Sequence, residues 1–192
     1  EVIVSVMEHH SNIVPWQIQA ARKGITLKVI PMNEKGELCM DSSVVFFRNG
    51  QNLFGYTCVE CARYDQSGKG DHRRSHNHEV PVLIDGAQAV PHLKADVQDL
   101  DAEFYVFSGH KIYGPTGIGV LYGKEEWLDK LLRTGGGEMI ASVSFEKRLS
   151  TNCLSSLRPE RLIYRKYGFG GSLRYVGRLG MDNIAAYEDE LL

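Results

Sequence analysis

The sequence predicts an α/β protein built around a doubly wound, mostly parallel β-sheet flanked by helices. Val80–Ile84 is a continuous apolar run that ends at Asp85, which is typical of a strand buried on both faces of a parallel sheet. Shorter apolar runs at Phe104–Phe107 and Ile118–Tyr122 predict two further strands. Segments with a helical period lie before and after these strands, and this alternation favours the α/β class.

The N-terminal part predicts a strand, a helix and a second strand. Glu1–Met7 is rich in β-forming apolar residues. Asn12 is expected to cap a helix that carries Pro15 in its first turn and stops at Gly24, because Asn, Pro and Gly favour those three positions. Ile25–Ile30 then alternates like a half-buried strand.

Two amphipathic segments predict helices in the second half of the chain. Glu125–Leu132 is the first, and Gly135–Gly137 is expected to end it. Ser172–Leu192 is the second, with apolar residues at helical spacing over its length.

Composition and charge exclude several classes of protein. The chain has 192 residues, a net charge of −2, 43% hydrophobic and 24% charged residues. A nucleic-acid binder would carry a basic excess, and no apolar run reaches the ~18–20 residues that span a bilayer. Four cysteines are too few for a disulfide scaffold. The chain begins with Glu and opens with no signal peptide, so we expect it to be part of a longer protein.

Polar residues follow two of the predicted strands. Asp85 ends one strand, and Lys111 comes just after another, flanked by Ser108 and His110. Ligands of open α/β sheets bind beyond the carboxyl ends of the strands. A lysine that forms a Schiff base and an acid that pairs with a pyridine nitrogen are what pyridoxal phosphate requires of its protein, and Ser108 and His110 could bind its phosphate. Taken alone, an aspartate at the end of a strand is more often a turn or cap residue, and a lone surface lysine is almost always solvated.

Three segments together resemble one enzyme family. EHHSNIVPWQ, VLIDGAQAVPH and EFYVFSGHKIYGPTGIGVLYG, followed by GGGEMI, are similar in residues and in order to the class V aminotransferases, in the branch of cysteine desulfurases and selenocysteine lyases. The resemblance covers residues 1–41, 76–149 and 169–192. It implies a fragment of the large, cofactor-binding domain of the fold-type I pyridoxal phosphate-dependent transferases, spanning 1–192.

The resemblance also implies roles for individual residues. Lys111 matches the Schiff-base lysine, Asp85 the partner of the pyridine nitrogen, Gln88 the partner of the ring hydroxyl, His9 the ring-stacking catalytic histidine, and Ser108 and His110 the phosphate ligands. Gly135–Gly137 with Glu138 matches a loop near a dimer interface. His10 is expected to be a structural neighbour. No metal is expected.

The reaction implied is removal of sulfur from L-cysteine to give L-alanine, with the sulfur held on an enzyme cysteine as a persulfide. Selenocysteine is the other substrate that the resemblance allows. It further implies a cytoplasmic homodimer that serves sulfur metabolism or iron–sulfur cluster assembly, with a possible sulfur-acceptor protein and with neither nucleic acid nor membrane as partner.

The chain departs from the family at both ends. The family's nucleophilic cysteine and its substrate-binding arginine are expected beyond residue 192, and one phosphate-binding segment before residue 1. None of Cys39, Cys58, Cys61 and Cys153 lies in the nucleophile motif. The small C-terminal domain is expected to be absent beyond the start of its linking helix. We therefore expect the chain to be inactive by itself.

Stretches 42–75 and 150–168 are anomalous, because they show neither a helical nor a strand period. A plausible coding sequence for Tyr56–His72, read one letter later, yields Thr-His-Val-Ser-Asn-Val-Leu-Gly-Thr-Ile-Asn-Pro-Val-Lys-Glu, which is family-like. Arg158–Tyr164, read two letters later, yields Ala-Gly-Thr-Pro-Asn-Ile. We hypothesise two paired frame disruptions, in the gene or in its sequencing. Tyr56–Arg63 would then have lost a central strand of the sheet, which would leave its neighbours unpaired.

Two functions of other classes stay open. Cys58-x-x-Cys61 followed by His72-x-x-x-His76 resembles a two-Cys, two-His zinc site, although its spacing is slightly short. The chain could then be a non-enzymatic zinc-binding or scaffold module. It could also be a non-functional, pseudogene-like product.

Overall fold

A computed structural model of the chain describes residues 1–39, 41, 55–59, 75–128 and 163–191. The strands are β1 (Val2–Ser5), β2 (Leu27–Ile30), β3 (Gly55–Val59), β4 (Val82–Asp85), β5 (Phe104–Ser108) and β6 (Gly119–Gly123). The helices are α1 (His10–Lys23), α5 (Val97–Leu100), α6 (Glu125–Leu128), α7 (Ile163–Leu179) and α8 (Met181–Leu191), with a 3-10 turn η1 (Gly109–Ile112).

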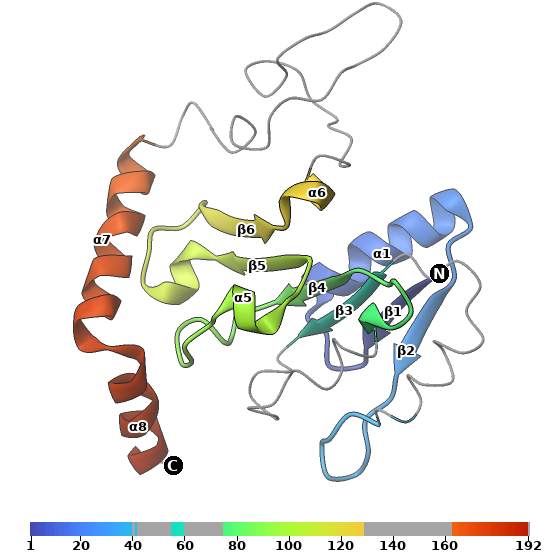
Figure 1. Cartoon of the computed structure of the whole chain (residues 1–192), viewed down its shortest axis with the longest axis horizontal. Helices are drawn as coiled ribbons and strands as arrows, with labels where there is room; N and C mark the ends of the chain where they lie inside the picture. Colours follow the sequence, from blue (N-terminus) through green and yellow to red (C-terminus); the bar gives the residue numbers. More distant parts are fainter. Residues whose placement is uncertain (40, 42–54, 60–74, 129–162, 192) are drawn as a thin grey trace, which may run out of the picture.

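The strands form one six-stranded sheet in the order β2-β1-β3-β4-β5-β6 (Figure 1). All neighbours pair in parallel except β5 and β6, which are antiparallel. The predicted α/β class with a mostly parallel sheet is therefore confirmed. Each predicted strand in the readable segments is present, with boundaries shifted by one or two residues.

The β1–α1–β2 unit follows the prediction except at the start of the helix. Gly24 ends α1 in the left-handed conformation, with φ 67°, which glycine adopts without strain. The cap at the other end is His9 and not Asn12, because the ring of His9 accepts a hydrogen bond from the backbone of Ser11. Asn12 lies inside the first turn and is buried.

The expectation that a central strand is missing is wrong. Gly55–Val59 forms β3, and it lies between β1 and β4 in register with both. Tyr, Thr and Val are favourable strand residues, and two parallel neighbours supply the backbone partners that the segment needs. The anomalous stretch 42–75 thus retains a strand, although the structure describes little else of it.

The C-terminal helix is longer than predicted and is divided. α7 begins within the anomalous stretch 150–168 and ends at Leu179, and α8 begins at Met181. Gly180 separates them at φ 83°, a conformation that interrupts a helix. The amphipathic segment Glu125–Leu132 is described only as far as Leu128, and Gly135–Gly137 lies outside the described residues.

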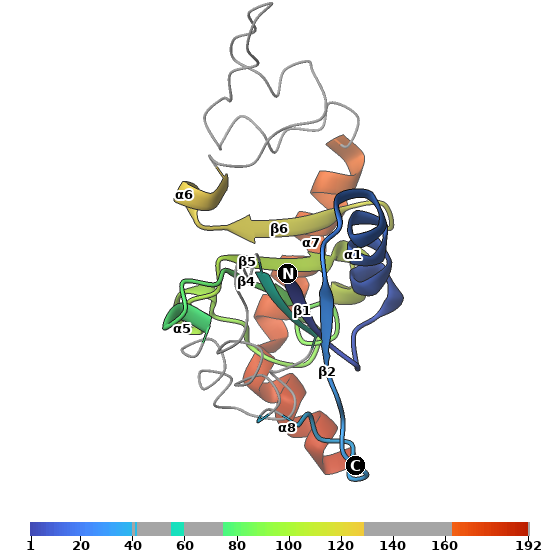
Figure 2. The same cartoon turned by 90° about the vertical axis from the view of Figure 1, so that its right-hand side faces the viewer.

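The two faces of the sheet have different partners. Figure 2 shows α1 on one side of the sheet and α5 on the other. Ile84 and Tyr105, which are partners in register, belong to the buried core together with Val176 of α7. Asp85 and Val106, the next pair in register, line a cavity instead. Because side chains alternate along a strand, one face builds the core and the other faces the cavity.

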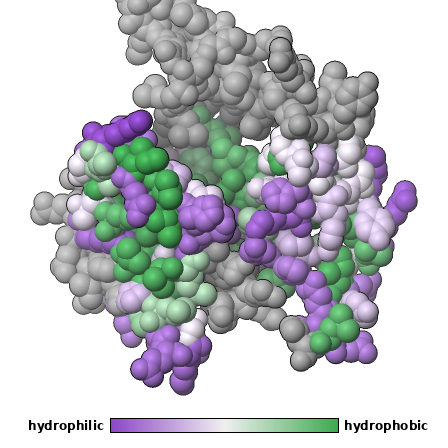
Figure 3. Space-filling view, turned by 180° about the vertical axis from the view of Figure 1, so that it is seen from behind, coloured by the Kyte–Doolittle hydropathy of each residue, from purple (hydrophilic) through white to green (hydrophobic). Residues whose placement is uncertain are grey.

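The surface is mixed in character. Seen from behind, apolar side chains gather on the side of α1 and β2, and the side of α7 and α8 is more polar (Figure 3). Val14 and Ile18 of α1 and Val29 of β2 are among the exposed apolar residues. Within the part of the chain that is described, no helix is long and apolar enough to cross a membrane.

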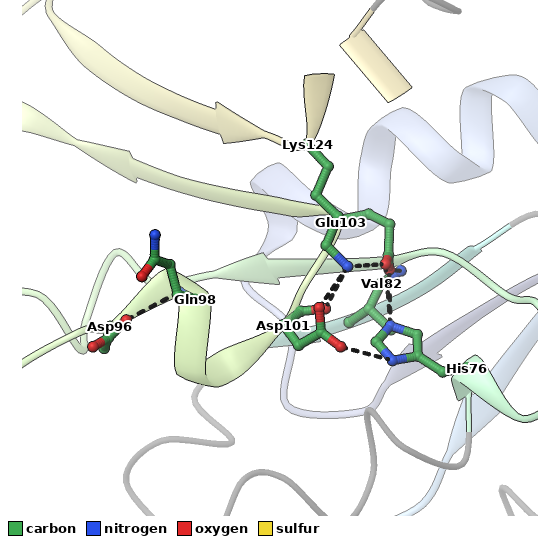
Figure 4. Close-up of polar contacts among 7 residues, drawn as sticks. All are labelled: His76, Val82, Asp96, Gln98, Asp101, Glu103 and Lys124. Carbon is green, nitrogen blue, oxygen red and sulfur yellow. Dashed lines mark hydrogen bonds and ion pairs between the residues drawn. The ribbon is translucent and has the colours of Figure 1, made fainter. Parts of the chain in front are cut away.

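A buried glutamate joins three strands at the edge of the sheet opposite the cavity (Figure 4). The Glu103 carboxylate accepts a hydrogen bond from the backbone N–H of Val82 at 2.6 Å and from Lys124 Nζ at 2.8 Å. His76 Nε2 lies 3.1 Å from Glu103 Oε1, and Lys124 also pairs with Asp101 at 2.7 Å. The cluster therefore ties the beginnings of β4 and β5 to the end of β6.

The pKa values of this cluster reflect its pairing. Burial alone would raise the pKa of Glu103, but the hydrogen bonds from Lys124 and Val82 and the nearby positive charges lower it below 4.5. For Lys124, burial lowers the pKa, and the hydrogen bonds to Asp101 and Glu103 raise it overall. Both groups are therefore charged at neutral pH.

We expect Glu103→Ala to lower the free energy of unfolding by about 3 kcal/mol, because it leaves the buried N–H of Val82 without its acceptor and removes one of the two carboxylate partners of Lys124. Urea unfolding followed by circular dichroism measures this. The difference in unfolding free energy between Glu103→Ala and the unmodified chain should have its full size above about pH 4.5. It should shrink as the pH falls through the lowered pKa of Glu103, because protonation of Glu103 removes the negative charge that the substitution also removes. The exposed Glu126→Ala is the control, and equal stability of the two variants would contradict the role of Glu103.

Candidate active site

A cavity of about 1160 Å³ lies where the carboxyl ends of β1, β4 and β5 meet. Its lining comes from the segment that joins β1 to α1, from the residues that follow β4, from the end of β5 with η1, and from the start of β6. In Figure 1 the end of β5 leads into the turn η1, which lies beside α7. This is the crevice in which open α/β sheets bind ligands.

All the site residues predicted from the sequence line this cavity. They are His9, Asp85, Gln88, Ser108, His110 and Lys111. They come from three separate segments of the chain, so only the fold brings them together. Their individual roles stay predictions.

Asp85 is held at the tip of β4 by the turn that follows it. Its Oδ1 accepts a hydrogen bond from the backbone N–H of Ala87 at 3.0 Å. The next residues form a tight turn in which Ala89 and Val90 both donate to the carbonyl of Gly86 at 3.0 Å. Gln88 lies within this turn and is exposed toward the cavity that it lines. The turn thus places the carboxylate and the amide at one rim.

Gly86 is required by the ring of Tyr105 from the neighbouring strand. A Cβ atom on Gly86 would lie 2.0 Å from that ring, far closer than packed atoms approach. The Gly86 N–H donates to the carbonyl of Val106 at 2.8 Å, which extends the β4–β5 ladder past the end of the strand. Burial, together with the charge of Asp85, raises the pKa of Tyr105 to about 12. The phenol therefore stays neutral beneath the turn.

Lys111 lies on η1, which is bounded on both sides by backbone hydrogen bonds. Gly109 donates to the carbonyl of Ile118 at 2.8 Å, and Gly114 donates back to the carbonyl of Gly109 at 2.9 Å. Tyr113 closes the turn in the left-handed region at φ 61°, which is uncommon for a residue with a side chain. The backbone that carries Lys111 is therefore closely specified.

His9 is the residue before α1 and caps that helix. Its Nδ1 accepts from the backbone N–H of Ser11 at 3.2 Å and lies 2.8 Å from Ser11 Oγ. Its ring centroid is 4.0 Å from that of His10. Sequence reasoning did not find Ser11 or this cap, because histidine is not among the favoured capping residues.

Glu8 is a second residue of the site that sequence reasoning missed. It lines the cavity and is only 6% exposed. Its carboxylate accepts from Ser5 Oγ and from Asn12 Nδ2, each at 2.7 Å, and Asn12 Oδ1 accepts from Trp16 at 3.2 Å. The spacing Ser5-x-x-Glu8-x-x-x-Asn12 is the signal that could have indicated this network.

The structure describes only part of the possible zinc site and none of the predicted loop near a dimer interface. Cys61 and His72 of the possible zinc site lie outside the described residues, as do Gly135–Gly137 and Glu138. Within the described segments, no three His, Cys, Asp or Glu side chains are grouped to hold a metal ion.

The donor set of the cavity fits pyridoxal phosphate. A primary amine, a carboxylate and an amide lie on its wall together with a hydroxyl and imidazoles, and these match an aldehyde, a basic ring nitrogen, a ring hydroxyl and a phosphate. Lys111, Asp85, Gln88, Ser108 and His110 are the residues that would hold such a group.

Comparison with known sequences gives consistent relatives. A cysteine desulfurase of Escherichia coli (strain K12 / DH10B) is 44% identical over 199 residues, covering 100% of this chain and 48% of that protein. A cysteine desulfurase of Synechococcus elongatus is 42% identical over 200 residues, covering 100% of this chain and 31% of that protein. The chain thus spans about half the length of the first relative and less of the second.

Solved structures and a family comparison agree. A crystal structure of an Escherichia coli cysteine desulfurase matches with a TM-score of 0.81 and 32% identity, covering 95% of this chain and 46% of that one. The apo cysteine desulfurase of Thermococcus onnurineus NA1 matches with a TM-score of 0.82 and 28% identity, covering 100% and 49%. The sequence pattern of the aminotransferase class-V family matches residues 1–192. The chain therefore belongs to the class-V aminotransferase family.

Proposed function

We propose that this chain is the cofactor-binding part of a pyridoxal phosphate-dependent cysteine desulfurase. The observation that carries the proposal is that Lys111 and Asp85 line one cavity at the carboxyl ends of parallel strands, beside His9. The sequence similarity to cysteine desulfurases supports the choice of reaction. Because those relatives are much longer, the activity belongs to the whole protein and not to these 192 residues alone.

Each site residue has one part in holding the cofactor. Lys111 would supply the amine that bonds the cofactor's carbonyl carbon. Asp85 would keep a proton on the ring nitrogen, and Gln88 would hydrogen-bond the ring hydroxyl. Ser108 and His110 would bind the phosphate, and His9 would cover the face of the ring.

The bound cofactor supplies an electron-accepting ring that stabilises negative charge at the α-carbon of an amino acid. Lys111 Nζ would act as the general base that takes the α-proton of the amino acid. The turn after β4 keeps Asp85 at the rim of the cavity. There its negative charge would hold a proton on the ring nitrogen.

The substrate and the partners follow from the same resemblance. L-cysteine is the proposed substrate, and selenocysteine is the alternative. A homodimeric, cytoplasmic parent that passes sulfur to an acceptor protein is part of the proposal. The small C-terminal domain of that parent would carry the sulfur-accepting cysteine.

We expect added pyridoxal phosphate to give the chain the absorbance band of a lysine Schiff base. Lys111→Ala should abolish this band, because the amine that forms the bond is gone. Absorbance titration of both proteins measures this. Lys94→Ala, which changes an exposed lysine outside the cavity, is the matched control and should keep the band. A band of equal strength in Lys111→Ala would overturn the assignment of Lys111.

Asp85→Asn should weaken cofactor binding roughly 10- to 100-fold, because a charged hydrogen bond contributes about 1.5–3 kcal/mol. Equilibrium dialysis with pyridoxal phosphate gives the dissociation constant. Asp189→Asn on the exposed face of α8 removes the same charge away from the cavity and should change nothing. Equal weakening by both variants would point to net charge instead of to Asp85.

The isolated 192-residue chain should bind the cofactor without releasing sulfide from L-cysteine. Cys39 is a free cysteine within the described residues, and it does not line the cavity. A sulfide assay at saturating cofactor tests this. Release that survives Cys39→Ser and is lost with Lys111→Ala would mean that another cysteine of this chain is the nucleophile, contrary to the proposal.

A further inference from the structure

The contact between His9 and α1 determines where the ring of His9 carries its proton. The backbone N–H of Ser11 points at His9 Nδ1 over 3.2 Å. A backbone N–H can only donate, so Nδ1 must accept with its lone pair. A neutral imidazole has one N–H, and that proton is therefore on Nε2. Ser11 Oγ, 2.8 Å from Nδ1, could pair with either tautomer, so the amide makes the choice.

The surroundings hold this contact in place. Glu8, directly before His9, is buried and is fixed by Ser5 on one side and by Asn12 on the other. The backbone N–H of Asn12 donates to the carbonyl of His9 at 2.8 Å, which begins the helix. His9 is thus anchored through its neighbours, its carbonyl and its ring nitrogen.

The other ring nitrogen is available for a ligand. Among the described residues, no group hydrogen-bonds His9 Nε2, and His9 is one of the residues that line the cavity. A nitrogen that already carries a proton cannot take another from a substrate. It can donate a hydrogen bond to a lone pair.

We infer that the first turn of α1 fixes His9 as the Nε2–H tautomer and makes it a hydrogen-bond donor, not a base, toward the ligand in the cavity. Ser11 is its positioning residue, through the backbone amide. The inference rests on the proposed function for the identity of the ligand, whose accepting atom would be an oxygen or sulfur of the bound amino acid. Removal of the α-proton then falls to Lys111 and not to His9.

Nitrogen NMR of the chain with ¹⁵N-labelled histidine tests the tautomer without any cofactor. At a pH well above the ordinary histidine pKa of about 6.5, His9 should show an unprotonated Nδ1 and a protonated Nε2. His10, for which the described residues provide a ring contact but no hydrogen bond, serves as reference and should show an average of both tautomers. His9→Asn assigns the signal, because asparagine preserves the cap. A protonated or averaged Nδ1 in His9 would overturn the inference.

Two substitutions separate the amide from the hydroxyl. Ser11→Ala keeps the backbone N–H, and His9 should keep its single tautomer. Ser11→Pro removes the N–H at a position in the first turn, where proline is tolerated, and the His9 signal should become averaged while circular dichroism still reports a folded chain. A folded Ser11→Pro with an unchanged tautomer, or an averaged tautomer in Ser11→Ala, would refute the role of the amide. If Ser11→Pro does not fold, the spectra of the unmodified chain and of Ser11→Ala still decide.

The outcome is separable from the proposed function. The tautomer is read in the absence of pyridoxal phosphate, and the Lys111-dependent absorbance band is read without reference to His9. A chain that binds the cofactor but shows a mixed His9 tautomer would refute only the tautomer assignment. A chain with the expected tautomer and no such band would refute the proposed function and leave the tautomer assignment in place.

Discussion

The hydrogen-bonded ladder between β4 and β5 is the constraint on which the rest of the site depends. It pairs Asp85 with Val106 in parallel, and the Gly86 N–H adds one more hydrogen bond beyond the strand end. Because side chains alternate, a slip of one residue would turn Asp85 from the cavity toward the core. The same slip would remove Gly86 from the ring of Tyr105, the one place where its missing side chain matters. The register of β4 against β5 therefore determines both the packing of the core and the geometry of the site.

The other ends of these strands are held by charge. Glu103, Lys124 and His76 join the beginnings of β4 and β5 to the end of β6, and no part of this cluster lines the cavity. A buried carboxylate is tolerated here because both its oxygens have partners. At the beginnings of β4 and β5, charged side chains hold the strands together. At the carboxyl ends of the same strands, polar side chains line the cavity, where a ligand can reach them.

The sequence predicted those features that local pattern determines. The apolar run before Asp85 was sufficient to predict β4, and Gly24 was sufficient to predict the end of α1. β3 was missed because Gly55–Val59 has no clear period of its own and is stabilised as a strand by β1 and β4. The cap by His9 was missed because it depends on ring orientation and not on residue type. Glu103 gave no signal, because its partners are distant in sequence.

The six site residues were found through family resemblance, whereas spacing alone indicated only Asp85, Lys111 and their neighbours.

The antiparallel direction of β6 has a consequence for motion. Because β6 begins next to the end of β5, Gly119 pairs with Ser108, and the chain between them is a short closed loop that carries Lys111. Both ends of the loop are pinned, so its backbone has little freedom to swing. The lysine amine can reach or leave a partner in the cavity only by rotation about its own side-chain bonds, and such rotations take picoseconds to nanoseconds when unhindered. A change of partner at that amine would then need no rearrangement of the loop or of the two strands that carry it.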